Sequence, residues 1–206
     1  SLMYLGYVRQ SNRNEKYELT MKLVKLSNQV IEKQDLLQTV RPYLRKLMEL
    51  TGETVHFVER NDTEVVYIDK VESYANSMQM VSRIGSRLPI YCSGVGKAIA
   101  AELPGPEVEK IWQNSHIVKR TEGTITDYEV FLETLKEVRR VGYAMDREEN
   151  ETGVVCIAAS LKDYRGKAEY AFSISAPVGR MPKERVEELA GYVLMTRREM
   201  QEAISR

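Results

Sequence analysis

The sequence predicts an α+β domain in which helices flank an antiparallel sheet. Several segments repeat apolar residues at the spacing of an amphipathic helix, and others alternate apolar and polar residues as half-buried strands do. The strand-like segments fall into two groups, with helical segments before, between and after them. This order favours an antiparallel sheet covered by helices.

The first 20 residues predict a short hairpin. Residues 7–10 and 16–19 have the pattern of two strands around a polar turn at 11–14. A two-stranded hairpin is only marginally stable in water, so we expect it to belong to a larger unit. Residues 2–5 are apolar and no helix start precedes them, which leads us to expect a truncated chain.

Two helices are expected next. Apolar residues spaced four, three and four apart from Leu19 to Val30 form one stripe, which predicts a connecting helix over residues 21–33. A second amphipathic helix follows, with Asp35 as its N-terminal cap. Pro42 is expected to kink this helix or to mark its true start.

The remaining elements follow from the same patterns. Strands are predicted at residues 55–57, 65–68, 78–82, 143–146, 154–159 and 170–175. Helices are predicted at residues 93–101, 107–113 and 129–140, and from Pro182 to the C-terminal region.

Composition restricts the class of protein. Of 206 residues, 43% are hydrophobic and 29% are charged, which is typical of a globular domain. Lys plus Arg equals Asp plus Glu at 30 each, whereas an isolated DNA-binding domain is normally basic. The sequence has no segment apolar enough to span a membrane and no signal-peptide pattern. Two cysteines in apolar or small-residue surroundings fit a reducing cytoplasm.

No catalytic signature emerges from the reactive side chains. His56 and His116 have no Cys, Asp or Glu at ligand spacing, so we expect no metal site, and a surface or strand-facing role is the simpler interpretation. Cys92 and Cys156 lack adjacent histidines or basic clusters, which favours buried structural thiols over nucleophiles. The glycines before Lys97 do not make a P-loop. We therefore expect neither an enzyme nor a cofactor.

Three features suggest ligand binding, and each has a plain structural alternative. The glycines at residues 94–96 begin a helix whose free N–H groups favour a carboxylate, although tight packing explains them equally well. Asp146 ends a strand and either accepts hydrogen bonds from ligand hydroxyls or caps a turn. Ser173 and Ser175 share one strand face, which lines a polar pocket or faces solvent.

Taken together, these segments resemble the IclR family of bacterial transcription regulators. Residues 85–98 (GSRLPIYCSGVGKA) resemble that family's central motif. Residues 142–150 (GYAMDREEN) with 153–158 (GVVCIA) resemble its second motif, and residues 173–177 (SISAP) its third. The motifs occur in the expected order and spacing, so the resemblance covers nearly the whole chain.

The resemblance implies a two-domain regulator with a winged helix-turn-helix that binds operator DNA and a GAF-like domain that binds a small organic acid. It assigns residues 1–20 to a remnant of the DNA-binding domain with its wing hairpin, 21–33 to the linker helix and 34–206 to the effector-binding domain. Arg9, Arg13 and Lys16 become candidates for DNA phosphate contacts. We expect the chain to bind effector but not operator.

The resemblance also implies an effector pocket. The backbone amides of Gly94 and Val95 correspond to those that hold the effector's carboxylate. Asp146 would repel that carboxylate, so the acid end should lie toward Gly94. The polar groups around the other effector oxygens correspond to Asp146, Cys156, Ser173 and Ser175.

The apolar wall of this implied pocket corresponds to Met80 and Leu88. Ser77 falls where some relatives have an apolar residue, so the pocket is expected to be larger or more polar there. The sequence around Cys92 and Asp146 looks closest to the branch that controls sugar-acid use. The effector is accordingly expected to be a sugar acid or a small α-keto acid.

The function implied is that of a cytoplasmic repressor whose effector changes its affinity for operator DNA, acting as a homodimer or homotetramer. Two alternatives remain from the residues themselves. One is a GAF-like enzyme with a redox-active cysteine. The other is a ligand-free dimerisation module, since one fold hosts many functions.

Overall fold

The computed structural model describes residues 1–11, 16–24, 35–73, 82–163 and 165–205. Its contacts divide the chain into two compact units, Ser1–Thr39 and Val40–Arg206. None of the described helices is long and apolar enough to cross a membrane.

The first unit contains the predicted hairpin. Strand β1 (Val8–Gln10) pairs antiparallel with β2 (Tyr17–Leu19), and Arg9 lies opposite Glu18. Residues 21–24 form a helical turn directly after the hairpin. The rest of the connecting helix predicted at residues 21–33 lies outside the described part of the chain, which omits residues 25–34.

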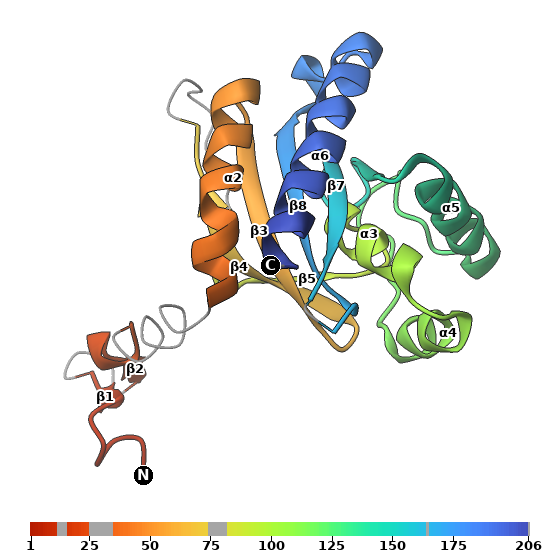
Figure 1. The fold of residues 1–206 in the computed structure, drawn as a ribbon. Helices are drawn as coiled ribbons and strands as arrows, with labels where there is room; N and C mark the ends of the chain where they lie inside the picture. The colour runs from red at the N-terminus through yellow and green to blue at the C-terminus, as the bar shows by residue number, and fades with distance from the viewer. Residues whose placement is uncertain (12–15, 25–34, 74–81, 164, 206) are drawn as a thin grey trace. The chain divides into compact units, whose positions relative to one another are not determined.

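The second unit contains a six-stranded antiparallel sheet in the order β5-β4-β3-β8-β7-β6 (Figure 1). The predicted α+β class with an antiparallel sheet is confirmed. β3 and β8 occupy the centre, so the two groups of strands seen in the sequence meet along that pair. The strands are β3 (Thr54–Asn61), β4 (Glu64–Val71), β5 (Arg87–Pro89), β6 (Ala144–Arg147), β7 (Val154–Lys162) and β8 (Ala168–Pro177).

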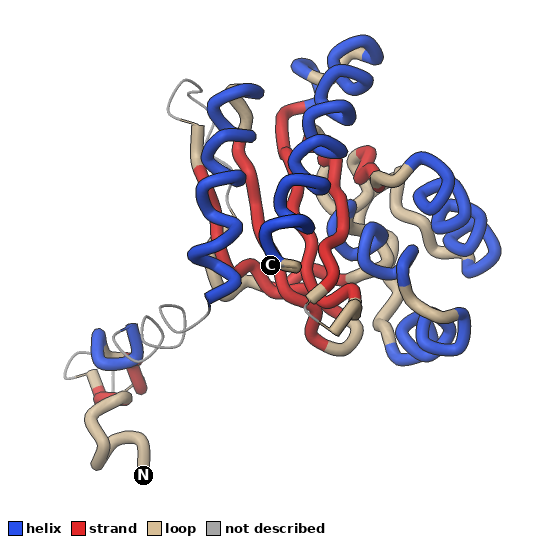
Figure 2. The backbone as a smooth tube through the Cα atoms, in the orientation of Figure 1, coloured by secondary structure: helices blue, strands red, loops and turns tan. Residues whose placement is uncertain are grey.

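Helices cover both faces of this sheet (Figures 1 and 2). On one face lie residues 40–51 of α2 (Asp35–Thr51) and α6 (Lys183–Ile204), joined by an ion pair in which Lys46 Nζ lies 2.8 Å from Glu199 Oε1. α2 begins at Asp35 and runs through Pro42, so the idea that Pro42 marks its true start is wrong. On the other face lie α3 (Gly94–Glu102), α4 (Gly105–Asn114) and α5 (Tyr128–Val141).

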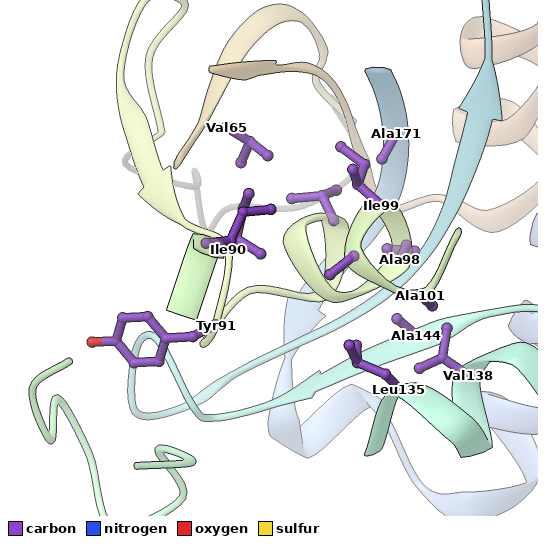
Figure 3. Packing of buried hydrophobic residues seen from close by; sticks show 14 of the residues in the cluster. Val65, Ile90, Tyr91, Ala98, Ile99, Ala101, Leu135, Val138, Ala144 and Ala171 are labelled. Carbon is purple, nitrogen blue, oxygen red and sulfur yellow. The ribbon is translucent and has the colours of Figure 1, made fainter. Parts of the chain in front are cut away.

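Helix α3 is the centre of the core on its face of the sheet. Its first eight residues are all buried, and most of them are small, which lets the helix lie close to strands β7 and β8. Figure 3 shows Ala98, Ile99 and Ala101 of this helix packed among side chains of the sheet and of α5, including Leu135 and Val138.

At Gly96, close packing against Ile90 leaves no room for a side chain. A Cβ at this position would lie 2.4 Å from Ile90 Cα, closer than atoms approach in proteins. Of the two interpretations of this glycine-rich start, close packing therefore accounts for Gly96. The predicted strand at residues 78–82 lies almost entirely outside the described residues.

Candidate functional site

A pocket lies between the start of α3 and the sheet. About 50 Å³ of it is open, enough for about three or four water molecules. Its lining comes from all six strands of the sheet, the first turn of α3 and the segments before β5 and after β6, and most of it is polar. The lining residues are His56, Tyr67, Ser82, Leu88, Ser93, Gly94, Val95, Asp146, Asn150, Glu151, Val154, Cys156, Ser173 and Ser175.

The first turn of α3 brings free backbone N–H groups to this pocket. Ser93 caps the helix: its Oγ accepts from the Gly96 N–H at 3.2 Å and donates to the Pro89 carbonyl at 2.7 Å. No described residue provides an acceptor for the N–H groups of Gly94 or Val95. Unpaired N–H groups at a helix start carry partial positive charge and favour an anion.

Asp146 faces this helix start from strand β6. A Cβ on Gly94 would lie 3.3 Å from the Asp146 backbone nitrogen, so the two backbones nearly touch. Asp146 Oδ1 accepts hydrogen bonds from the N–H groups of Glu149 at 2.7 Å and Asn150 at 3.4 Å. The residue therefore caps a turn, and it also lines the pocket.

The carboxyl group of Asp146 binds its proton unusually tightly. Burial raises its pKa to about 7, and the neighbouring Glu149 carboxylate acts in the same direction. The two backbone hydrogen bonds and the charge of Lys97 oppose this shift without cancelling it. Near neutral pH the side chain therefore exists in both protonated and ionised forms.

A buried ion pair behind Asp146 was not foreseen from the sequence. Lys97 Nζ contacts Glu149 Oε1, and the two residues are only 1% and 6% exposed. Among the described residues, nothing hydrogen-bonds to Glu149 Oε2. The pair ties α3 to the segment after β6. Lys97 directly follows the glycine-rich start of α3, and Glu149 belongs to the acidic pair at residues 148–149. No local pattern in the sequence predicts that these two side chains contact each other.

Strands β7 and β8 bring Cys156, Ser173 and Ser175 to the pocket, as the resemblance implied. Ser175 Oγ lies 3.1 Å from Cys156 Sγ and 3.1 Å from His56 Nδ1. His56 Nε2 in turn lies 2.7 Å from Ser82 Oγ. A chain of polar groups thus runs along this wall.

His56 is a pocket residue that sequence reasoning missed. Burial, followed by the charge of Lys70, lowers its pKa to about 3, so the ring is neutral at physiological pH. His56 lies opposite Ser173 in the β3–β8 pairing and therefore on the same face. The alternation of strand β3 was visible in the sequence, but its register against β8 was not.

Leu88 and Tyr67 form the apolar part of the wall. Leu88 lies in β5, as the resemblance implied, and Tyr67 in β4 stacks at a tilt on His56 with ring centroids 4.9 Å apart. Met80 and Ser77, the other wall positions considered, lie outside the described residues.

The two thiols are poorly suited to nucleophilic chemistry. Burial raises the pKa of Cys92 to about 11 and raises that of Cys156 well above its usual value. Thiols in this state stay protonated at neutral pH, and the thiolate is the reactive form. Across the described residues, no three His, Cys, Asp or Glu side chains gather as metal ligands do.

The residues considered for DNA contacts lie on the hairpin. Arg9 Nη2 lies 3.1 Å from Glu18 Oε2, yet the Arg9 side chain remains 71% exposed. Lys16 is exposed just before β2, and Arg13 lies outside the described residues.

A larger open groove of about 980 Å³ lies between the β3–β4 turn and α4. Its main charged group, Arg60, already pairs with Glu107 at 2.6 Å and with Glu169 at 3.0 Å. The polar pocket at the start of α3 is therefore the stronger candidate.

Comparisons with known proteins agree with this fold. Residues 28–205 match the family model described as bacterial transcriptional regulator IclR C-terminal. The transcriptional regulator KdgR of Escherichia coli is 39% identical over 191 residues, covering 93% of this chain and 71% of KdgR. The transcriptional repressor YiaJ of Escherichia coli is 34% identical over 207 residues, covering 99% of this chain and 72% of YiaJ.

Solved structures show the same relationship. The Thermotoga maritima IclR structure aligns with a TM-score of 0.87 at 30% identity, covering 100% of this chain and 82% of that one. The C-terminal domain of Escherichia coli KdgR aligns with a TM-score of 0.75 at 32% identity, covering 84% of this chain and all of that domain. The relatives named here are transcription regulators. The chain therefore belongs to the IclR family, is a transcription regulator with that family's effector-binding C-terminal domain, and is not an enzyme.

Proposed function

We propose that this chain binds a small organic acid, a sugar acid or an α-keto acid, in the pocket at the start of α3. Regulators of the IclR family bind operator DNA and small-molecule effectors. The observation that carries the proposal is the pair of unpaired N–H groups on Gly94 and Val95, which lie beside Asp146, Ser173 and Ser175 in one pocket.

In this proposal the effector's carboxylate binds the N–H groups of Gly94 and Val95, where the helix dipole favours negative charge. Its hydroxyl or keto oxygens bind Asp146, Ser173, Ser175 and Cys156. Leu88 and Met80 contact its carbon skeleton. His56, which is neutral, adds one more hydrogen-bonding group to the polar wall.

Asp146 sets a condition on the bound acid. A carboxylate at Gly94 lies close to Asp146, so binding favours the protonated form of Asp146, whose pKa burial raises to about 7. The open volume of about 50 Å³ is small, so a compact α-keto acid enters with less displacement of the walls than a six-carbon sugar acid.

Effector binding then alters the affinity of the full-length protein for operator DNA. A ligand shifts such an equilibrium only through its different affinity for the two states. We propose a cytoplasmic homodimer or homotetramer that acts as a repressor, in which Arg9, Arg13 and Lys16 contact DNA phosphates. Repression is the role printed in the names of the relatives YiaJ and AllR.

A thermal-shift screen against glyoxylate, pyruvate and a panel of sugar acids tests the proposal. An acid at about 100 times its dissociation constant adds roughly 2.7 kcal/mol of stability. Asp127→Ala is the matched control for Asp146→Ala, because Asp127 is also a capping carboxylate that accepts a backbone N–H, here from Val130 at 3.0 Å.

One acid should stabilise the wild type and Asp127→Ala but not Asp146→Ala. Equal stabilisation of all three proteins contradicts the pocket assignment. If no acid stabilises the wild type, a ligand-free dimerisation module becomes the better account.

A further inference from the structure

A second cavity lies on the other side of strand β6. Alternate residues of a strand point to opposite faces, so Asp146 faces the polar pocket while Met145 and Arg147 face away from it. The residues that face away line a separate cavity of about 280 Å³ between β6 and α5. Nothing in the proposed function uses this space.

The walls of this second cavity are mainly apolar. Val138 and Val141 come from α5, Tyr143 and Met145 from the β6 segment, and Ile125 from the segment before α5. Glu137 and Arg147 are its exposed lining residues, and Thr134 is half-buried.

The inner end of the cavity contains the buried ion pair of Lys97 and Glu149. Among the described residues, Lys97 Nζ donates only to Glu149 Oε1, although an ammonium has three donors. Glu149 Oε2 has no partner among them and is buried. The ion pair therefore places a free acceptor, Glu149 Oε2, beside the remaining N–H donors of Lys97 Nζ.

This combination selects one chemical class of ligand. A hydroxyl group donates one hydrogen bond and accepts others, so it matches Glu149 Oε2 and Lys97 Nζ together. A carboxylate placed there is repelled by Glu149, and an ammonium is repelled by Lys97. We propose that the cavity between β6 and α5 is a second small-molecule site, which binds an uncharged alcohol or phenol with an apolar body.

The second site is connected to the polar pocket by short links. The Glu149 backbone N–H donates to Asp146 Oδ1 at 2.7 Å, and Lys97 lies one helical turn after Gly94. A ligand that moves the ion pair therefore moves the groups of the polar pocket. The second site itself does not rest on the proposed function.

Benzyl alcohol and toluene are suitable probes, because they differ by one hydroxyl group. The protein is labelled with 13C at its methionine methyl groups, and Met145, which lines the cavity, reports locally. Its resonance is assigned by its absence from Met145→Leu. Met200, fully buried in α6, is the reference resonance.

Benzyl alcohol should shift the Met145 resonance saturably and leave Met200 unchanged. Toluene should bind roughly tenfold more weakly or worse, because it lacks the hydroxyl that hydrogen-bonds to the two charged groups. Equal affinity for the two probes overturns the assignment of the hydroxyl class. A Met145 resonance that does not shift, or that shifts without saturation, overturns the site.

Two tryptophan variants on α5 add a second measurement. Val141→Trp fills the cavity from its half-buried wall, whereas Val130→Trp places the same side chain at a position that is 53% exposed and outside the cavity. The saturable shift should persist in Val130→Trp and vanish in Val141→Trp. Persistence in both variants places the alcohol elsewhere and overturns the proposal. The comparison of the two probes in the wild type stands even if Val141→Trp does not fold.

Discussion

The Glu149 backbone N–H donates to Asp146 Oδ1 over 2.7 Å, and this bond joins the acid of the polar pocket to a buried ion pair. Asp146 lies on β6, which is an edge strand of the described sheet and pairs only with β7. Its orientation therefore depends on the segment that follows it. The Thr124 hydroxyl supports that segment by donating to the Glu149 carbonyl at 2.7 Å.

Replacing Lys97 should be strongly destabilising. Lys97→Met leaves the Glu149 carboxylate buried without its counter-ion, and such changes cost about 3–5 kcal/mol. The double variant Lys97→Met/Glu149→Leu should recover most of this loss, because the unpaired charge is gone. Urea unfolding of both proteins gives the comparison. A cost below about 1 kcal/mol for the single variant contradicts a dry, buried pair.

Three glycine-to-alanine variants should separate packing from site geometry. Gly96→Ala places a Cβ 2.4 Å from Ile90 Cα. Because a backbone atom cannot move away without distorting the chain, the free energy of unfolding should fall by roughly 1–3 kcal/mol or more. Gly94→Ala meets the Asp146 nitrogen at 3.3 Å, which should weaken acid binding more than stability. Gly191→Ala is the control: it lies within α6 with nothing within 4 Å.

The control should gain about 0.5–1 kcal/mol, because alanine favours a helix interior over glycine. Unfolding free energies by urea titration order the three variants. If Gly96→Ala is as stable as Gly191→Ala, the close packing of α3 on Ile90 is wrong.

Much of the fold followed from local patterns, and the exceptions have physical reasons. The helix at Pro182 and the strands of β7 and β8 could be predicted because their signals lie within a few residues of each other. The course of α2 through Pro42 could not, since proline is unfavourable inside a helix and only tertiary packing compensates for it.

The site shows the same limit more sharply. Gly94, Asp146, Ser173 and Ser175 were identified through motifs that lie in separate segments, and the structure brings them to one pocket. His56 was missed because its place depends on the pairing of β3 with β8. Strands 100 residues and more apart in sequence carry no local signal of their register.

Asp146 should make the protein less stable as the pH rises. Its pKa is about 7 in the folded protein against 3.8 for the ordinary side chain, so the folded state holds more protons between these values. The stability is fully present below about pH 4 and is lost as the pH rises to about 7, on the order of 4 kcal/mol at most. Lys97 and Glu149 are the charged groups that act on it.

Asp146→Asn removes this titration while keeping an oxygen for both backbone N–H groups. Relative to wild type, the variant should gain roughly 1.4 kcal/mol per pH unit between about pH 4 and pH 7. Urea unfolding at four pH values in this window measures the difference. A stability difference that stays constant over the window shows that the folded carboxyl titrates normally.

His56 should act in the opposite direction over nearly the same window. Its pKa is about 3 in the folded protein against 6.5 for the ordinary side chain, so the unfolded state takes up a proton first as the pH falls. The stability of the neutral ring is present above about pH 6.5 and is lost on acidification toward pH 3. His56→Gln removes the titration and keeps hydrogen-bonding groups for Ser175 and Ser82.

The two residues together provide the sharper test, because their slopes oppose each other between about pH 4 and pH 6.5. The unfolding free energy of His56→Gln, measured relative to wild type, should rise as the pH falls. That of Asp146→Asn, measured in the same way, should rise as the pH rises. The double variant should differ from wild type by an amount nearly independent of pH in this window, since equal and opposite proton terms are removed together. A double variant that keeps the slope of either single variant shows that only one of the two buried groups is shifted.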